Sequence, residues 1–165
     1  MTESKPSKSE LKRQQQTLQR LGEQLIGLSD ELLQGLTLND RLLDAINDIR
    51  RMKSHEAIRR QKQYIGKLMR DVDPAPIQAL LERLRADDRR QKRIFADAER
   101  WRDRLVHDGV EALEAFAIAT GGSNPDLRTL LEALDQAKSD RVERDIRKRI
   151  FRATHAALVA QSRDG

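Results

Sequence analysis

The densest set of chemically capable side chains in this sequence is a run of cations between Arg50 and Arg70. The run holds eight Lys and Arg residues against one acid, Glu56, and so carries +7, whereas the whole chain of 165 residues carries +5. The rest of the chain is therefore net negative. Cations at this density can neutralise phosphates and release their counterions, which drives salt-sensitive binding to nucleic acid. The eight are Arg50, Arg51, Lys53, Arg59, Arg60, Lys62, Lys67 and Arg70.

The spacing of five of these cations places them on one side of a helix. At 100° per residue, Ile58, Ile65 and Leu68 fall on the opposite side. A solvated helix face normally mixes both signs of charge, and this one hardly does, so a polyanion-binding surface is favoured over a plain solvated face. A membrane-surface helix has similar charges, but its apolar side must be free, and here the core is expected to use it. The basic face comprises Arg59, Arg60, Lys62, Lys67 and Arg70, with Gln63 and Gly66 between them.

Three other basic stretches are weaker candidates. Lys12 and Arg13 form a lesser site for the same partner. The other two have acids close by in sequence, so pairing within the helix explains them about as well as a ligand does. The first is a possible secondary RNA site and comprises Arg89, Arg90, Lys92 and Arg93. The second lies on the last predicted helix and comprises Arg147, Lys148, Arg149 and Arg152.

The glycine and the aromatic residues near the basic face allow more than one interpretation. Gly66 either lets a phosphate approach the helix backbone or is an ordinary surface glycine. Tyr64 could stack on an unpaired base, but the favoured interpretation is a tyrosine buried at the edge of the core. Trp101 is expected in the core, because it lies on an apolar stripe.

The residue types argue against an enzyme, and we expect no catalytic activity, metal or cofactor. Cysteine is absent, and His55, His107 and His155 lack the spacing of paired metal ligands. The sequence has neither a phosphate-binding glycine loop nor a nucleophile elbow. No apolar run approaches the 18 residues of a membrane span, and the N-terminus does not resemble a secretory signal. A cytoplasmic protein is therefore expected.

The apolar spacing predicts helices throughout the chain. A capping box formed by Ser7 and Glu10 starts the first helix, which is expected to end at Gly35. The apolar stripe changes face near Ser54, which favours a helix break there over a kink. Asn39 or Asp40 is expected to cap the next helix. A long helix is predicted from Ala75 to His107, and a short one from Val110 to Gly121. Asn124-Pro125 starts a further helix, and the last one is predicted from Asp140 to Ala160.

The apolar stripes predict which side of each helix is buried. Gly22 lies at the edge of the first stripe, where a glycine suggests close approach of another helix. The first stripe comprises Leu11, Leu18, Leu21, Leu25, Leu28 and Leu32. The long helix has two stripes, Ile77, Leu80, Leu81 and Leu84, then Phe95, Ala98, Trp101 and Leu105. Later helices are expected to bury Val110, Leu113 and Phe116, then Leu127, Leu130, Leu131 and Leu134, and finally Val142, Ile146, Ile150 and Leu158.

The long predicted helix suggests how the chain is organised. Its stripe is interrupted by Asp88 and Gln91, which we expect to be exposed. The predicted architecture is therefore all-α, with two small three-helix lobes sharing one long helix as a dumbbell; a single elongated bundle is the alternative. The expected parts are a flexible N-terminus (1–6), an N-terminal lobe (7–87), a C-terminal lobe (88–162) and a tail (163–165).

Four stretches of this sequence resemble the DarP (YjgA-like) family of bacterial ribosomal maturation proteins. They are SKSELKR at 7–13, RRQKQYIGKLMR at 59–70, ERWRDRL at 99–105, and LRTLL at 127–131 together with RIFR at 149–152. The second is the most specific, and it coincides with the basic face found from charge alone. The resemblance implies an all-helical, non-catalytic factor that binds late precursors of the large ribosomal subunit. It also implies contact with rRNA close to the peptidyl-transferase region.

Two functions from different classes follow from these observations. The first is a ribosome assembly factor whose partners are large-subunit rRNA and pre-50S particles, with no membrane and no small-molecule substrate. It is expected to act as a monomer on the ribosome. The second is a helical protein–protein adaptor that docks acidic partners, because an acidic protein surface would also fit the basic face.

Overall fold

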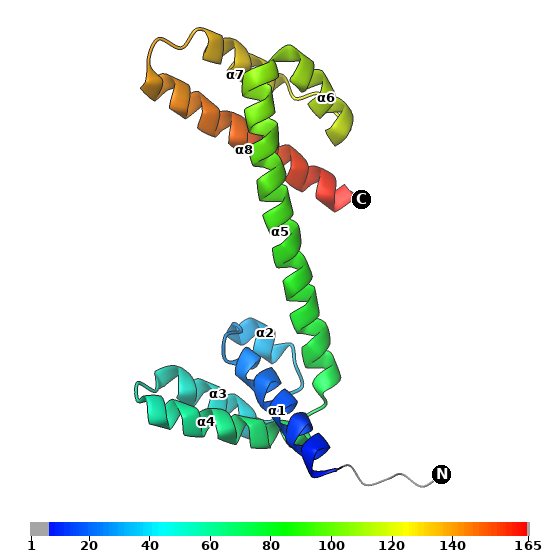
Figure 1. Ribbon diagram of the computed structural model, residues 1–165, viewed down its shortest axis with the longest axis vertical. Coiled ribbons are helices and arrows are strands. Elements are labelled where there is room, and N and C mark those ends of the chain that lie inside the picture. The colour runs from blue at the N-terminus through cyan, green and yellow to red at the C-terminus, as the bar shows by residue number, and fades with distance from the viewer. Residues whose placement is uncertain (1–6, 165) are drawn as a thin grey trace, which may run out of the picture. The chain divides into compact units, whose positions relative to one another are not determined.

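The computed structural model describes residues 7–164, and every regular element in that range is a helix (Figure 1). The all-α prediction is therefore confirmed. The elements are α1 (Lys8–Leu25), α2 (Asp30–Gln34), α3 (Asp40–Arg51), α4 (His55–Leu68), a 3-10 turn η1 (Met69–Asp71), α5 (Pro74–Asp108), α6 (Val110–Thr120), α7 (Pro125–Asp135) and α8 (Asp140–Asp164). The predicted N-terminal segment 1–6 lies outside the described residues.

The chain divides into two compact units, and the boundary falls between Leu84 and Arg85 within α5. Each unit has its own hydrophobic core. The first part of α5 contributes Ile77 and Leu81 to one core, and its last part contributes Leu105 to the other. Asp88 and Gln91 are exposed, as predicted. The dumbbell arrangement stays a prediction.

Most helix starts follow directly from local capping residues. The backbone N–H of Ser7 donates to Glu10 Oε2 over 2.9 Å, and Glu10 N–H donates back to Ser7 Oγ over 3.3 Å, which completes the predicted capping box. Asn39 caps α3, and Asn124 caps α7 just before Pro125. Ser54 caps α4, so the predicted break after α3 is confirmed.

The first helix ends earlier than predicted. It stops at Leu25 rather than Gly35, because Ser29 caps a separate short helix by accepting from Leu32 N–H. The break changes which side is buried, so Leu33 replaces Leu32 in the core. Leu11 was also predicted to face the core but is half-exposed, since it lies toward the N-terminal end of α1, away from that helix's buried residues.

The core of the first unit depends on a close crossing of α1 and α4. A Cβ on Gly22 would lie only 2.6 Å from Ile65 Cγ2, which confirms the predicted role of this glycine. A Cβ on Gly66 would lie 2.9 Å from Gln19 Cβ and 3.2 Å from its Cα. Gly66 is buried, so both interpretations offered for it are wrong: it is neither open to phosphate nor a surface glycine. Each helix thus presents a glycine to the other.

Replacing Gly66 with alanine should destabilise the first unit. The new methyl group would press on Gln19, including its backbone, and overpacking of this kind costs about 1–3 kcal/mol. The better helix propensity of alanine would return up to about 1 kcal/mol. We expect a net loss of roughly 1–2 kcal/mol in chemical denaturation. Gly27→Ala is the control, because a Cβ there would meet only the Gln24 carbonyl oxygen, at 3.9 Å. Equal stability of the two variants would contradict the close crossing.

The second unit is built around Phe116 and Ile150. The Phe116 ring meets Trp101 edge-on with centroids 5.1 Å apart, and Trp101 packs on this core while remaining partly exposed. Phe95, Val110 and Val142 were predicted to be buried, but each is about half-exposed. Ile94 takes the place of Phe95, because it lies four residues before Ala98, which itself lies seven before Leu105, so that the three share one side of the helix.

The last helix runs four residues beyond the predicted end at Ala160, to Asp164. Its extension therefore enters the segment predicted to be a tail. Gln161 gives a physical reason, because its side-chain amide donates to the backbone carbonyl of Ala119 over 2.6 Å. That hydrogen bond ties the end of α8 to α6 within the second unit.

Candidate nucleic-acid interface

The basic face is carried by α4, whose other side is held in the core by Ile65 and Met69, the latter in the adjoining η1 turn. Arg59, Lys67 and Arg70 are exposed, and none makes an ion pair within residues 7–163. Arg60 is exposed as well and pairs with Glu56 one turn earlier. Four of the five predicted cations are therefore exposed, three on α4 and Arg70 in η1.

The structure joins this face to the lesser site predicted on α1. A groove of about 290 Å³ is lined by residues of both helices, with Lys12 on α1 and Lys67 on α4. Sequence reasoning missed the other α1 residues that line the groove, since their importance depends on the crossing of the helices. They are Gln15, Gln16 and Gln19, which face Gln63 and Gly66 of α4. The groove thus combines two cationic ammonium groups with amides that can donate and accept hydrogen bonds.

Lys62 differs from its neighbours on the basic face. It is only partly exposed, and its ammonium group lies 3.0 Å from Glu23 Oε2 of α1. Burial acts to raise the pKa of Glu23, but hydrogen bonds from Lys62 and Gln19 outweigh it and lower that pKa. Lys62 therefore fastens α4 to α1, and part of its charge is already neutralised.

The Glu23–Lys62 pair should make the stability of the first unit depend on acid pH. Because the pKa of Glu23 is lowered on folding, its contribution is complete above the ordinary value of 4.5 and is lost as pH falls below it. Glu23→Gln should cost on the order of 0.5 kcal/mol at neutral pH and flatten the stability profile below that value. Denaturation midpoints measured from neutral to acid pH test this. Parallel profiles for the variant and the parent would contradict it.

Arg50 has a structural role that the sequence did not reveal. Its Nε donates to the Ile26 carbonyl over 3.0 Å, another guanidinium nitrogen donates to the Leu28 carbonyl, and a third binds Asp30 at 2.6 Å. The guanidinium thereby satisfies the carbonyls left free where α1 ends. Arg51 and Lys53, the other predicted cations of this segment, are exposed at the end of α3 and in the turn before α4.

Tyr64 is 45% exposed, so the prediction that it is buried at the edge of the core is wrong. It follows Gln63 on α4, and the adjacent Ile65 takes the buried position. Arg13 is exposed on α1, as a phosphate-binding residue must be. Both residues remain available to a ligand of the basic face.

The secondary candidates are more nearly balanced in charge. All four cations from Arg89 to Arg93 are exposed, but Arg90 pairs with Asp87 at 3.5 Å and Lys92 pairs with Asp88 at 2.7 Å. On α8, Arg147 pairs with Glu143 at 2.6 Å. The predicted pairing within these helices is confirmed for these residues.

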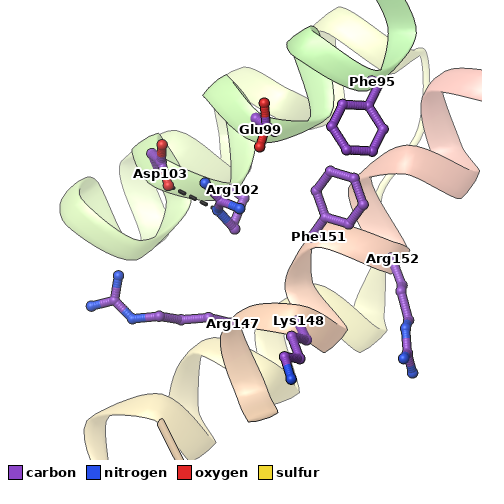
Figure 2. Close-up of a pocket in the computed structure, with 8 residues that line it drawn as sticks. All are labelled: Phe95, Glu99, Arg102, Asp103, Arg147, Lys148, Phe151 and Arg152. Atoms are coloured by element: carbon purple, nitrogen blue, oxygen red, sulfur yellow. Dashed lines mark hydrogen bonds and ion pairs between the residues drawn. The ribbon is translucent and has the colours of Figure 1, made fainter. Parts of the chain in front are cut away.

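A second hollow, of about 410 Å³, lies between α5 and α8 of the second unit (Figure 2). It combines two phenylalanines with charged side chains of both signs. Sequence reasoning did not assemble it, because its residues come from two distant segments. They are Phe95, Glu99, Arg102 and Asp103 of α5, and Arg147, Lys148, Phe151 and Arg152 of α8.

Among the described helices, none has the length and apolar character needed to cross a lipid bilayer.

Comparison with known proteins shows which family this chain resembles. The family model "Dual-action ribosomal maturation protein DarP" matches residues 4–155. A protein of that name from Thiobacillus denitrificans is 39% identical over 157 residues, which cover 94% of this chain and 88% of the relative. The Nitrosomonas eutropha protein is 40% identical over 136 residues, covering 82% and 77%. The Vibrio vulnificus protein is 44% identical over 108 residues, covering 66% and 58%. With a match of this extent, the chain belongs to the DarP family of dual-action ribosomal maturation proteins.

Proposed function

We propose that this ribosomal maturation protein is a non-enzymatic assembly factor that binds late precursors of the large subunit through their rRNA. In this proposal it acts in the cytoplasm, uses no cofactor and promotes maturation near the peptidyl-transferase region. The observation that carries the proposal is the basic surface shared by α4 and α1. We define this basic surface as Arg59, Arg60, Gln63, Lys67 and Arg70 of α4 and η1 with Lys12 and Arg13 of α1.

The composition of this surface suits an RNA backbone. Arg59, Lys67 and Arg70 are exposed and form no ion pair in the described part of the chain, so a phosphate ligand would not have to displace a carboxylate. The groove beside them is lined by four glutamines, whose amides can both donate to phosphate oxygens and accept from ribose hydroxyls. Most contacts in protein–nucleic acid complexes are of these two kinds.

The second candidate, a helical adaptor that docks acidic proteins, uses the same surface. Its supporting observation is charge alone, because carboxylates on a protein would also be attracted to these cations. The amide-lined groove favours RNA over this alternative, since amides can also contact the ribose hydroxyls that line an RNA backbone.

Co-sedimentation separates the two candidates. The full chain is mixed with large-subunit precursor particles and resolved on a sucrose gradient, in parallel with particles stripped to protein-free rRNA. The proposal predicts migration with the precursors and measurable binding to the stripped rRNA, weakened by salt in both cases. Binding to intact particles combined with no affinity for rRNA would contradict it and favour the adaptor.

A further inference from the structure

We propose that the hollow between α5 and α8 is a second RNA site that takes one unstacked base, with guanine preferred. We call it the base pocket and define it by Phe95, Glu99, Arg102, Asp103 and Phe151, with Lys148 and Arg152 beside it. The inference rests on the proposed RNA-binding function but concerns the other unit of the chain. Its volume of about 410 Å³ lies within the range of small-molecule sites, roughly 300–1,000 Å³.

One end of the base pocket is aromatic. Phe95 of α5 and Phe151 of α8 meet edge to face, with ring centroids 5.1 Å apart (Figure 2). Phe151 is held between neighbours, since its ring stacks on His155 at 5.9 Å and Arg102 lies 6.0 Å from its centroid. Phe95 remains 50% exposed. Phe95 thus packs edge-on against Phe151 and His155 and still keeps exposed surface, as a stacking platform for a base requires.

The other end is polar and lies one to two turns further along α5. Arg102 Nε donates to Asp103 Oδ1 over 2.8 Å, and this hydrogen bond lowers the pKa of Asp103. The carboxylate is thus charged at neutral pH, and its Oδ2 can accept from a ligand. Glu99 adds a second carboxylate on the same wall. Guanine presents two neighbouring N–H donors on its Watson–Crick edge, which match a carboxylate acceptor.

Cations around the base pocket suit the phosphates on either side of the bound base. Lys148 and Arg152 lie one turn apart on α8, extend away from α5 in Figure 2, and make no ion pair within the described residues. Arg147 also lines the pocket, where Glu143 holds it at 2.6 Å. A base between the helices would thus have its backbone along the cationic side of α8.

This combination favours a nucleotide over an acidic peptide. A peptide carboxylate would be attracted to Lys148 and Arg152 beside the pocket, as a phosphate would. Further in it would meet Glu99 and Asp103, which repel it, and it would gain nothing from the exposed ring of Phe95. A base uses every part of the pocket: its face stacks on Phe95, its donor edge reaches the carboxylates, and its phosphates lie near Lys148 and Arg152.

Fluorine NMR tests the base pocket directly, because the chain has only three phenylalanines. The full chain is labelled uniformly with 4-fluorophenylalanine and titrated with an RNA hairpin that has one guanine in an unpaired loop. We expect the Phe95 and Phe151 resonances to shift. The Phe116 resonance should not, since that ring is fully buried in the core of the second unit. Absence of a Phe95 shift at any RNA concentration, or an equal shift with a polyglutamate peptide, overturns the proposal.

Matched variants test the stacking and the base preference. Phe95→Leu should weaken binding of the looped hairpin by about fivefold or more, with Ile118→Ala, another exposed apolar residue, as control. Asp103→Asn should reduce the preference for a guanine over a uracil loop, whereas Glu132→Gln, which removes the same charge from α7, should preserve it. An unchanged preference in Asp103→Asn would contradict the assigned edge. Thermal melting confirms that each variant is folded.

The outcome is distinguishable from failure of the proposed function. If labelled protein binds precursor particles but Phe95 does not respond to looped RNA, the base pocket is wrong and the proposed function stands. If Phe95 responds while particles and stripped rRNA are not bound, the proposed function is wrong and the pocket stands as a nucleotide site.

Discussion

Phe116→Ala should remove about 3–5 kcal/mol from the stability of the second unit, the largest loss we expect from one substitution. The ring is fully buried, packs edge-on against Trp101 and lies at the centre of the core formed by α5, α6, α7 and α8. Truncation therefore removes apolar contacts and leaves a cavity that the surrounding helices fill only in part. Chemical denaturation measures the loss. Val110→Ala on the same helix is the control, because Val110 is 55% exposed and should change stability little.

The same experiment tests whether the two cores are independent. Leu25 is fully buried in the first unit, and Leu25→Ala should cost about 2–5 kcal/mol. The two substitutions share no packing neighbours within the described cores, so their effects should add to within about 0.5 kcal/mol in the double variant. A coupling energy well above that value would argue for one continuous core.

Replacing Arg59, Lys67 and Arg70 with glutamine should markedly weaken binding to large-subunit particles. These side chains are exposed and unpaired in the described residues, so the fold should lose no more than about 0.5 kcal/mol. Each lost phosphate contact lowers the salt dependence of log K, and we expect the slope to fall by about one or more. If affinities converge at 1 M salt, a change of one corresponds to about tenfold weaker binding at 0.1 M. Lys62 is excluded because it pairs with Glu23.

The matched control removes the same charge from elsewhere on the protein. Arg41, Arg83 and Lys138 are exposed and lie outside the basic surface and the base pocket. Changing these three to glutamine should leave the salt slope near that of the parent. If both triple variants lose affinity equally, net charge rather than the basic surface governs binding. If neither does, the basic surface is not the RNA site.

Helix starts were predictable because the interactions that define them are local. Ser7, Asn39 and Ser54 each accept a hydrogen bond from a backbone N–H three residues later, so the signal lies within one turn of sequence. The end of α1 was not predictable in this way. Arg50, 24 residues beyond Ile26 in the chain, binds the carbonyls exposed there, and no local pattern records that contact.

The candidate site was predictable in its charge and not in its shape. A helical wheel separates the cations of α4 from its buried residues, but it does not show which neighbouring helix covers the edges. For that reason Gly66 and Lys62 were assigned to the open face. In the structure α1 covers Gly66 through Gln19, and Glu23 of α1 pairs with Lys62. The groove and the base pocket each need two helices that are distant in sequence, and only the fold brings these together.

Site-specific photo-crosslinking can show whether the groove between α1 and α4 contacts rRNA in the bound particle. A benzophenone amino acid is placed at Gln63, which lines the groove, or at Glu31, an exposed residue of α2 outside it. Each full-length protein is bound to large-subunit precursor particles and irradiated, and the crosslinked partner is identified. We expect crosslinks from position 63 to rRNA, with few or none from position 31. Crosslinks from position 63 only to ribosomal proteins, or equal rRNA crosslinking from both positions, would contradict it.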